Sequence, residues 1–179
     1  MVYVLLGTGF EETEAIAPID LLRRAGVDVL TVGINGKLIY GGHGIGVEAN
    51  ITIEQMDLTR LDMVVLPGGL GGVKSIRESK PAMDAIRFAH ENGKFVAAIC
   101  AGPTILAELG ITDGKDAVCY PGCEEDMGSA NMVTAPCVRS GMVITGTSAG
   151  CAVPFGLALV AALKGQAAAD RIAKQIVIL

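Results

Sequence analysis

The sequence contains no tryptophan, and aromatic residues make up only 4% of the chain. Charged residues are also scarce, at 18%, and their balance is acidic, with a formal net charge of -5 at pH 7. Proteins that bind single-stranded nucleic acid need aromatic platforms and basic grooves. Anionic membrane surfaces likewise attract basic rather than acidic proteins. We therefore expect neither nucleic acid nor a membrane as a partner.

Cysteine is present but shows no pairing pattern. The five cysteines are an odd number and lie at positions 100, 119, 123, 137 and 151. A chain of 179 residues buries enough surface to need no disulfide scaffold. The first residues, MVYVLLGTGFEETE, lack the basic start of a secretory signal and soon become acidic. We expect free thiols and a cytoplasmic location.

One long uncharged stretch resembles a membrane span in length. Residues 142–163 carry no charged side chain over 22 residues, which is long enough to cross a bilayer. The stretch is interrupted by TGTSAG and by Pro154, which are typical of a turn between a short strand and a helix. We predict that it belongs to the protein core.

Short apolar runs alternate with helical patterns along the chain. The predicted strands are residues 2–6, 27–32, 61–69 and 95–100, with further β segments at 116–120, 131–138 and 142–146. The predicted helices are residues 11–26, 81–93, 103–109, 151–163 and 166–175, and residues 36–53 are expected to form short strands and glycine turns. Pro18 predicts a kink or a late start in the first helix.

This alternation predicts an α/β fold. Continuous apolar strands between helices are typical of a parallel sheet that is covered on both faces. No linker or repeat interrupts the pattern, so we expect one domain over residues 1–179. Ligands of such folds bind at the carboxyl ends of the strands. The predicted strand ends are Gly7-Thr8-Gly9, Pro67-Gly68-Gly69, Cys100-Ala101-Gly102 and Gly146-Thr147-Ser148.

Glycine-rich motifs at these ends fail as nucleotide sites. GTGFEE has Glu12 where a dinucleotide fingerprint needs its third glycine, and acidic residues at a helix start repel a pyrophosphate. GGLGGVKS lacks the order of a phosphate-binding loop, so its glycines are expected to form plain turns.

Neither a serine hydrolase nor a metal site is expected. GTSAG at residues 146–150 matches a nucleophile elbow, but that fold needs a histidine after the serine, and both His43 and His90 precede Ser148. Cys119 and Cys123 have no second ligand pair nearby, so we expect buried free thiols rather than zinc ligands. His90 lies near a predicted helix end and receives no catalytic role.

Cys100 stands in a different context, where a predicted strand ends and a helix begins through AGP. Free N–H groups and the dipole at a helix start favour a thiolate. The glycine pair 68–69 ends a predicted neighbouring strand and offers backbone N–H groups for an oxyanion. From the residues alone, a buried core cysteine and a nucleophile are equally plausible readings of Cys100.

The motif AAICAGP, together with LPGG and GFEETEAIAPIDLLRRAG, resembles the ThiJ/PfpI superfamily over essentially the whole chain. The likeness is closest to the branch of the parkinsonism-associated protein deglycase. It implies a flavodoxin-like three-layer sandwich of the class I glutamine amidotransferase-like kind, usually a homodimer, with no organic cofactor. It also implies roles for four residues: Cys100 as nucleophile, Glu14 as an acid contacting the sulfur, and Gly69 and Ala101 as backbone donors.

The sequence departs from the resembled pattern at two positions. Ala101 follows the cysteine where the protease-like branch has histidine, which disfavours a peptidase. Tyr120 stands before Pro121 where the deglycase branch often has histidine, and residues 116–140 contain none, so the general base is not identified. The segment GGHGIGVEAN resembles a family segment at the dimer interface, which suggests that His43 approaches the partner's Cys100.

Three functions remain in view. The first is a cofactor-free glyoxalase or deglycase type of enzyme, in which a Cys100 thiolate attacks reactive small carbonyls. The second is a redox-sensing or chaperone-like stress protein that uses oxidation of Cys100. A peptidase or amidase ranks below both because of Ala101. The fold hosts several chemistries, so the site must decide between them.

Overall fold

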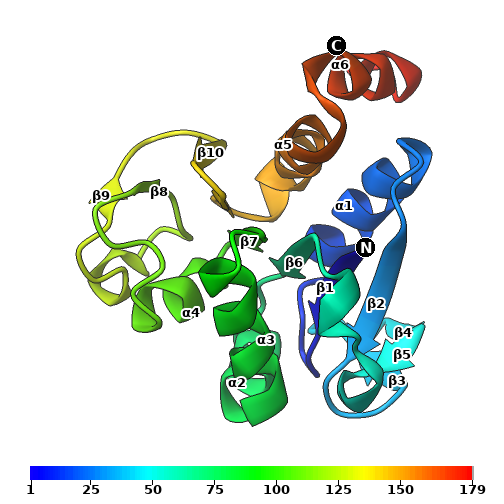
Figure 1. The fold of residues 1–179 in the computed structure, drawn as a ribbon, viewed down its shortest axis with the longest axis vertical. Helices are drawn as coiled ribbons and strands as arrows, with labels where there is room; N and C mark the ends of the chain where they lie inside the picture. The colour runs from blue at the N-terminus through cyan, green and yellow to red at the C-terminus, as the bar shows by residue number, and fades with distance from the viewer. Residues whose placement is uncertain (179) are drawn as a thin grey trace.

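The computed structural model describes residues 1–178 and is built around a seven-stranded sheet (Figure 1). Across the sheet the strands are, in order, β10 (Cys137–Ser140), β11 (Val143–Gly146), β7 (Phe95–Ile99), β6 (Met63–Leu66), β1 (Val2–Leu6), β2 (Val29–Gly33) and β5 (Ile51–Thr52). All neighbours pair in parallel except β10, which is antiparallel to β11. The predicted α/β fold with a mostly parallel sheet, of the flavodoxin-like kind, is confirmed.

Helices cover both faces of this sheet, which gives three layers (Figure 1). One layer contains α1 (Glu12–Arg24), α5 (Ala152–Lys164) and α6 (Gln166–Gln175), and the other contains α2 (Leu70–Glu78), α3 (Lys80–Glu91) and α4 (Pro103–Glu108). In β1, Val2, Val4 and Leu6 pack into the first layer, whereas Tyr3 and Leu5 pack into the second. Both faces of the strand are buried, which explains its continuous apolar sequence.

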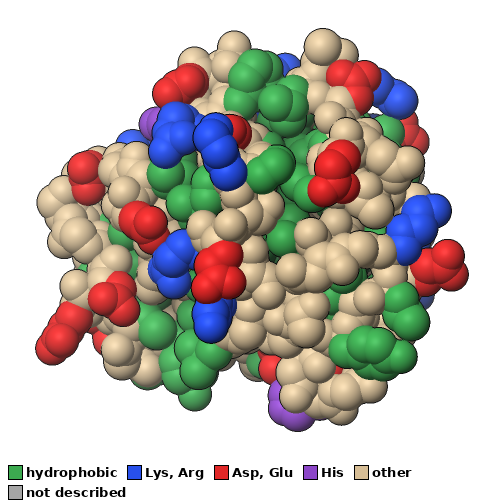
Figure 2. Space-filling view, turned by 90° about the horizontal axis from the view of Figure 1, so that it is seen from below, with side chains coloured by type: hydrophobic (Ala, Val, Ile, Leu, Met, Phe, Trp, Pro, Cys, Tyr) green, Lys and Arg blue, Asp and Glu red, His purple; other side chains and the backbone are tan. Residues whose placement is uncertain are grey.

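Smaller elements lie beside the main sheet. They are the hairpin of β3 (Leu38–Tyr40) and β4 (Gly46–Glu48), the parallel pair of β8 (Asp116–Ala117) and β9 (Asn131–Met132), and short 3-10 turns at Ile53–Gln55, Leu58–Arg60, Glu124–Asp126 and Ala149–Cys151. The predicted β segments 116–120 and 131–138 are therefore much shorter or divided. On the face seen in Figure 2, acidic and basic side chains are interspersed.

Most predicted helices and strands are present with shifted ends, and residues 166–175 match α6. Residues 142–163 form β11, a turn and α5, as predicted. Among the described residues, no helix is both long and apolar enough to cross a membrane. Helix α1 begins at Glu12 with Pro18 inside it, so the alternative of a late start is wrong.

Helix α2 was not predicted from the sequence. GGLGGVKS was expected to form plain turns, but its residues from Leu70 onward belong to a helix. Glycine lowers helix propensity, yet here packing requires it. A Cβ on Gly72 would lie 2.7 Å from the Cα of Phe10, and one on Gly71 would lie 2.9 Å from the carbonyl oxygen of Thr8. The glycines allow α2 to lie directly against the loop between β1 and α1.

Candidate active site

The carboxyl ends of β1, β6, β7 and β11 lie beside a cavity of about 600 Å³. All five residues that the sequence analysis selected line this cavity: Glu14, His43, Gly69, Cys100 and Ala101. They come from four separate parts of the chain, which meet because parallel strands end at the same edge of the sheet. The structure thus brings the predicted residues together in one place.

Cys100 occupies a strained turn directly after β7. Its φ angle is +66°, a left-handed conformation that L side chains other than Asn and Asp rarely adopt. Two backbone hydrogen bonds hold the turn: the Cys100 N–H donates to Gly146 O at 3.0 Å, and the Cys100 carbonyl accepts from the Tyr120 N–H at 2.8 Å. The side chain is partly exposed and faces the cavity, so Cys100 is not a sealed core cysteine.

Two backbone N–H groups are available at the Cys100 sulfur. The N–H groups of Ala101 and Gly69 both lie beside this sulfur and act to lower the pKa of the Cys100 thiol. Among residues 1–178, neither of them donates to a backbone oxygen. Gly69 has a φ of +85°, and a Cβ there would lie 2.5 Å from Gly9 O, so only glycine fits. The arrangement suits an anion that forms on or near the sulfur.

Glu14 supplies a buried carboxyl beside the thiol. Its side chain is 1% exposed, and its Oε2 accepts the Gly68 N–H at 2.9 Å. The carboxyl contacts the Cys100 thiol, and its Oε1 accepts no hydrogen bond from an N–H or O–H group among residues 1–178. Burial raises the pKa of Glu14 despite these contacts, which favour the charged form.

Gly68 lies between the acid and the thiol. A Cβ at this position would be 2.5 Å from Glu14 Oε2 and 2.6 Å from Cys100 Cβ. Any side chain here would therefore push the two groups apart. From the sequence, the N–H groups of both Gly68 and Gly69 were expected to serve an oxyanion, but the Gly68 N–H donates to Glu14 Oε2 instead.

The resting thiol is harder to ionise than the sequence suggested. Burial, then the negative charge of Glu14 and its hydrogen bond, raise the pKa of Cys100 to about 12, against the N–H groups of Ala101 and Gly69, which lower it. The N–H groups at the helix start act in the expected direction, but burial and the charged Glu14 act against them. Helix α4 has only six residues, and burial outweighs its effect.

The pKa of about 12 applies while Glu14 is charged. When the carboxyl takes up a proton, its repulsion of the sulfur anion disappears, and its O–H becomes a donor to that anion. The net charge of the pair is the same whether the shared proton is on sulfur or on oxygen. Glu14 and Cys100 thus form a coupled pair that holds one transferable proton.

His43 lies on the rim of the cavity of its own chain, in the turn between β3 and β4. Its Nδ1 is 3.0 Å from Glu12 Oε2 and 3.5 Å from Glu11 Oε2, and its side chain is 72% exposed. The hydrogen bond with Glu12 and the charges of both carboxylates raise the pKa of His43. Burial acts to raise the pKa of Glu12, but the hydrogen bonds that it accepts hold it below its usual range.

Glu11, Glu12 and His43 bring three potential metal ligands within 4.8 Å of one another, and no other group among residues 1–178 does so. The Glu12 carboxylate, however, already accepts the His43 N–H at 2.8 Å and approaches the Ile45 N–H at 3.4 Å. It therefore holds the turn between β3 and β4 in place. We assign it this structural role.

Tyr120, Cys123 and Ser148 also line the cavity, and of these only Ser148 was predicted to lie at a ligand-binding strand end. Cys123 was expected to be buried, but it is partly exposed, whereas Cys119 is buried as predicted. Exposure of Cys123 depends on the loop after β8, which no local pattern in the sequence indicates.

The family of the chain can now be stated. Residues 1–162 match the model of the DJ-1/PfpI family. The chain belongs to the DJ-1/PfpI family. The resemblance that AAICAGP and its companion motifs carry is thereby confirmed.

Known proteins are similar to this chain over most of its length. Protein dj-1beta of Drosophila melanogaster is 33% identical over 178 residues, 98% of this chain and 95% of the relative. The crystal structure of Drosophila melanogaster DJ-1beta has a TM-score of 0.95 and covers 99% of this chain and 97% of that one. Oxidized DJ-1 of Toxoplasma gondii has a TM-score of 0.93 at 29% identity, over 98% and 96% of the two chains. A protein of Pyrococcus abyssi named as a deglycase is 33% identical over 131 residues, 73% of this chain and 78% of its own.

Proposed function

We propose that the protein is a cofactor-free enzyme that acts on reactive small carbonyls such as methylglyoxal, with Cys100 as its nucleophile. The observation that carries the proposal is the setting of this one sulfur: a strained turn, two free N–H donors and a buried proton-sharing acid. The relative that is named as a deglycase supports the same class of substrate.

The first step needs no free thiolate in the resting enzyme. As the sulfur attacks the aldehyde carbon, the Cys100 proton passes to Glu14, a carbon–sulfur bond forms, and the carbonyl π electrons move to oxygen. The N–H groups of Gly69 and Ala101, which face the sulfur, stabilise the resulting oxyanion. The product is a hemithioacetal bound to Cys100.

Glu14 is also placed to move the second proton. Glu14 first gives the proton taken from Cys100 to the oxyanion, which completes the hemithioacetal and restores the carboxylate. In a bound dicarbonyl, the carboxylate then removes the hydrogen from the former aldehyde carbon as a proton, which leaves an enediolate. Return of that proton to the neighbouring carbon, as the hydroxyl proton passes to the neighbouring oxygen, gives a thioester. Water then cleaves the thioester, releases a hydroxy acid such as lactate and restores the thiol. Residues 116–140 contain no histidine, so the same carboxyl must accept and donate in turn.

Oxidation of Cys100 is the second candidate function. The sulfur is partly exposed in an open cavity, and its two N–H donors suit a sulfenate or sulfinate as well as an oxyanion. The Toxoplasma gondii relative is described in an oxidized state. The same thiol can serve both functions. A peptidase is disfavoured, since Ala101 occupies the place of the histidine that such enzymes carry.

We also propose that the protein acts in the cytoplasm as a homodimer. The hairpin of β3 and β4 exposes three large apolar side chains, Leu38, Tyr40 and Ile45, near the rim that carries His43. A second copy that covers this hairpin would bury them and bring His43 close to the partner's cavity. Nucleic acid and membrane are not expected as partners.

Replacement of Cys100 tests the carbonyl reaction. Cys100→Ala is expected to reduce lactate formation from methylglyoxal to the rate without enzyme, because no other group in the mechanism can form the carbon–sulfur bond. Cys137→Ala, which removes a thiol that does not line the cavity, serves as the matched control and is expected to retain activity. Full activity of the Cys100→Ala protein would refute the proposal.

A further inference from the structure

A second thiol shares the cavity with Cys100. Of the five cysteines, Cys100 and Cys123 are the two that line it, and both are partly exposed. Neither the carbonyl mechanism nor the assigned roles of the other lining residues uses Cys123. Two thiols that face one space form a pair that can be oxidised to a disulfide.

The backbone ties the two cysteines together. The Tyr120 N–H donates to Cys100 O at 2.8 Å, and the Cys123 N–H donates to Tyr120 O at 2.9 Å. One residue therefore bridges the strained turn of Cys100 and the tight turn that ends at Cys123. Gly122, inside that tight turn, has a φ of +96°, which glycine adopts without strain, and its N–H donates to Glu124 Oε2 at 2.7 Å.

The remaining three thiols do not line the cavity. Cys119 is only 5% exposed and is buried in a small cluster with Ala117 and Met127, against which Cys123 also packs. Cys137 has its sulfur 3.8 Å from Pro154 O, and Cys151 has its sulfur 4.0 Å from Ser148 Oγ. Because Cys123 alone shares the cavity with Cys100, it is the candidate partner of Cys100.

The surroundings of the two sulfurs also set the order of oxidation. Cys100 has two N–H donors and an acid that can accept its proton. Burial raises the pKa of both thiols, that of Cys100 to about 12, and the charges of Asp126 and Glu124 add to the effect at Cys123. Cys100 has in addition the buried Glu14 carboxyl beside it to accept its proton as it reacts, so we expect Cys100 to react first with a peroxide and Cys123 to react second.

We propose that Cys123 is the resolving thiol of this site, and that it closes a reversible disulfide with oxidised Cys100. In the first step Cys100 attacks a peroxide: a sulfur–oxygen bond forms, the O–O bond breaks, and a sulfenic acid and water result. In the second step Cys123 attacks that sulfur, the S–S bond forms, and the hydroxyl leaves as water. A dithiol reductant then restores both thiols. The disulfide competes with further oxidation of Cys100 to sulfinic acid.

The test is disulfide mapping after one equivalent of hydrogen peroxide, on the full chain under non-reducing conditions. We expect a peptide that links Cys100 to Cys123, and its disappearance on treatment with dithiothreitol. In Cys123→Ser the link should be absent and the sulfinic acid at Cys100 should increase several-fold. The matched control Cys119→Ser, which removes a nearby thiol outside the cavity, should behave like the unmodified sequence.

Other outcomes contradict the inference. A link between Cys100 and any other cysteine, disulfide-linked dimers on a non-reducing gel, or equal sulfinic acid in the Cys123→Ser and unmodified proteins would each overturn it. The inference extends the redox role proposed for Cys100 and does not need a carbonyl substrate. Lactate formation by Cys100→Ala therefore tests the carbonyl proposal separately, and either can fail while the other stands.

Discussion

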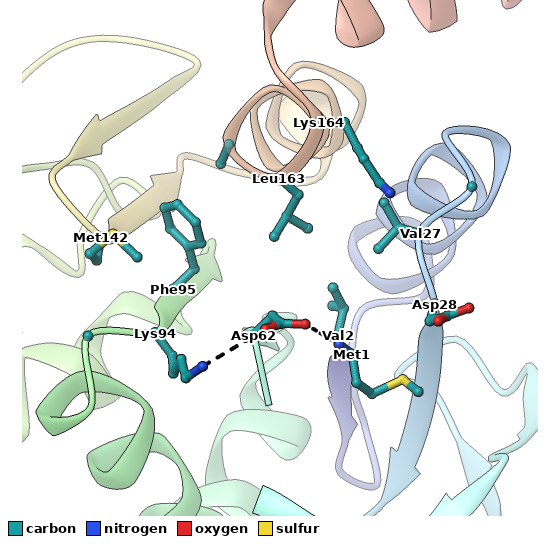
Figure 3. A pocket seen from close by; sticks show the side chains of 13 residues that line it. Met1, Val2, Val27, Asp28, Asp62, Lys94, Phe95, Met142, Leu163 and Lys164 are labelled. Carbon is teal, nitrogen blue, oxygen red and sulfur yellow. Dashed lines mark hydrogen bonds and ion pairs between the residues drawn. The ribbon is translucent and has the colours of Figure 1, made fainter. Parts of the chain in front are cut away.

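The two ends of the central sheet carry cavities of similar size but different chemistry. The carboxyl ends surround about 600 Å³ next to Cys100, and the amino ends surround about 470 Å³ next to Asp62 and Phe95. At the amino ends, Asp62 forms ion pairs with Lys94 and with the amino group of Met1 (Figure 3). Leu163 supplies part of the apolar wall (Figure 3).

The two ends differ in whether their polar groups are exposed to water and have hydrogen-bond or ion-pair partners. The Asp62 side chain is 58% exposed, so water and two cations stabilise its charge. The Glu14 side chain is 1% exposed, and its Oε1 has no hydrogen-bond partner in the described part of the chain. At the same end, Cys100 has a strained φ angle, and the Gly69 N–H has no backbone oxygen acceptor among the described residues. Unsatisfied, desolvated groups of this kind mark functional sites, whereas cavity volume alone does not.

After the removal of Cys100 itself, the largest effect is expected from Gly68→Ala. The new Cβ would need to occupy space 2.5 Å from Glu14 Oε2 and 2.6 Å from Cys100 Cβ, so the acid and the thiol must separate. Displacement of reacting groups by about 1 Å costs ~100-fold in rate. We expect a loss of this order in kcat/KM for methylglyoxal, together with about 1–3 kcal/mol in the free energy of unfolding from overpacking.

The matched control is Gly42→Ala. At Gly42 the nearest heavy atoms to a new Cβ are 3.6 and 3.7 Å away, which is ordinary contact, and the residue does not line the cavity. Steady-state kinetics and denaturant unfolding of both variants check the prediction. If Gly68→Ala is destabilised and yet fully active, the close approach of Glu14 and Cys100 has no part in catalysis.

A smaller and more diagnostic effect is expected from Glu14→Gln. Removing the carboxylate removes its charge and its hydrogen bond, both of which raise the pKa of Cys100 toward about 12. The midpoint of Cys100 alkylation by iodoacetamide should therefore move to lower pH, while lactate formation falls because the proton acceptor is lost. A midpoint that moves to higher pH would show that Glu14 favours the thiolate and would contradict this prediction.

The same variant changes the pH dependence of stability. The pKa of Glu14 is raised above its ordinary value of 4.5, so the folded state binds this proton more tightly than the unfolded state. The stability contributed by this group is complete below pH 4.5 and is lost as the pH rises through the folded pKa. Glu14→Gln should accordingly gain stability relative to the unmodified protein as the pH increases from 4 to 8. Thermal unfolding across that range is the measurement.

The fold could be predicted well because a strand that is buried on both faces has a continuous apolar sequence. The run VYVLL predicts a strand that is covered on both faces, and the strand-end rule alone places Cys100 at a ligand site. The position of Glu14 came only from the family resemblance, but the residues contain a signal for it. Glu14 shares a helix face with Pro18, Leu21 and Leu22, all of them buried in α1, at spacings of four, seven and eight residues.

Other features depend on contacts between distant segments. By local propensity the glycines of α2 disfavour a helix. They nevertheless allow the helix to pack against the loop that contains Phe10. The raised pKa of Cys100 depends on its burial and on how closely Glu14 approaches it across Gly68. A helix-start argument considers only the neighbours in sequence, so it includes the N–H group of Ala101, which lowers the pKa of Cys100, but omits burial and Glu14, which raise it.

The smallest effect is expected at the opposite end of the sheet, from Lys94→Gln. Lys94 Nζ lies 3.9 Å from Asp62 Oδ1, at the edge of ion-pair distance, and both side chains are at least 37% exposed. Exposed pairs of this kind contribute about 0.2–1 kcal/mol, so the free energy of unfolding should change by no more than that. Because no described group of the Cys100 site contacts this pair, kcat/KM should be unchanged. A fall in kcat/KM without loss of stability would show that the two ends are coupled through the strands, and the comparison drawn between them would then fail.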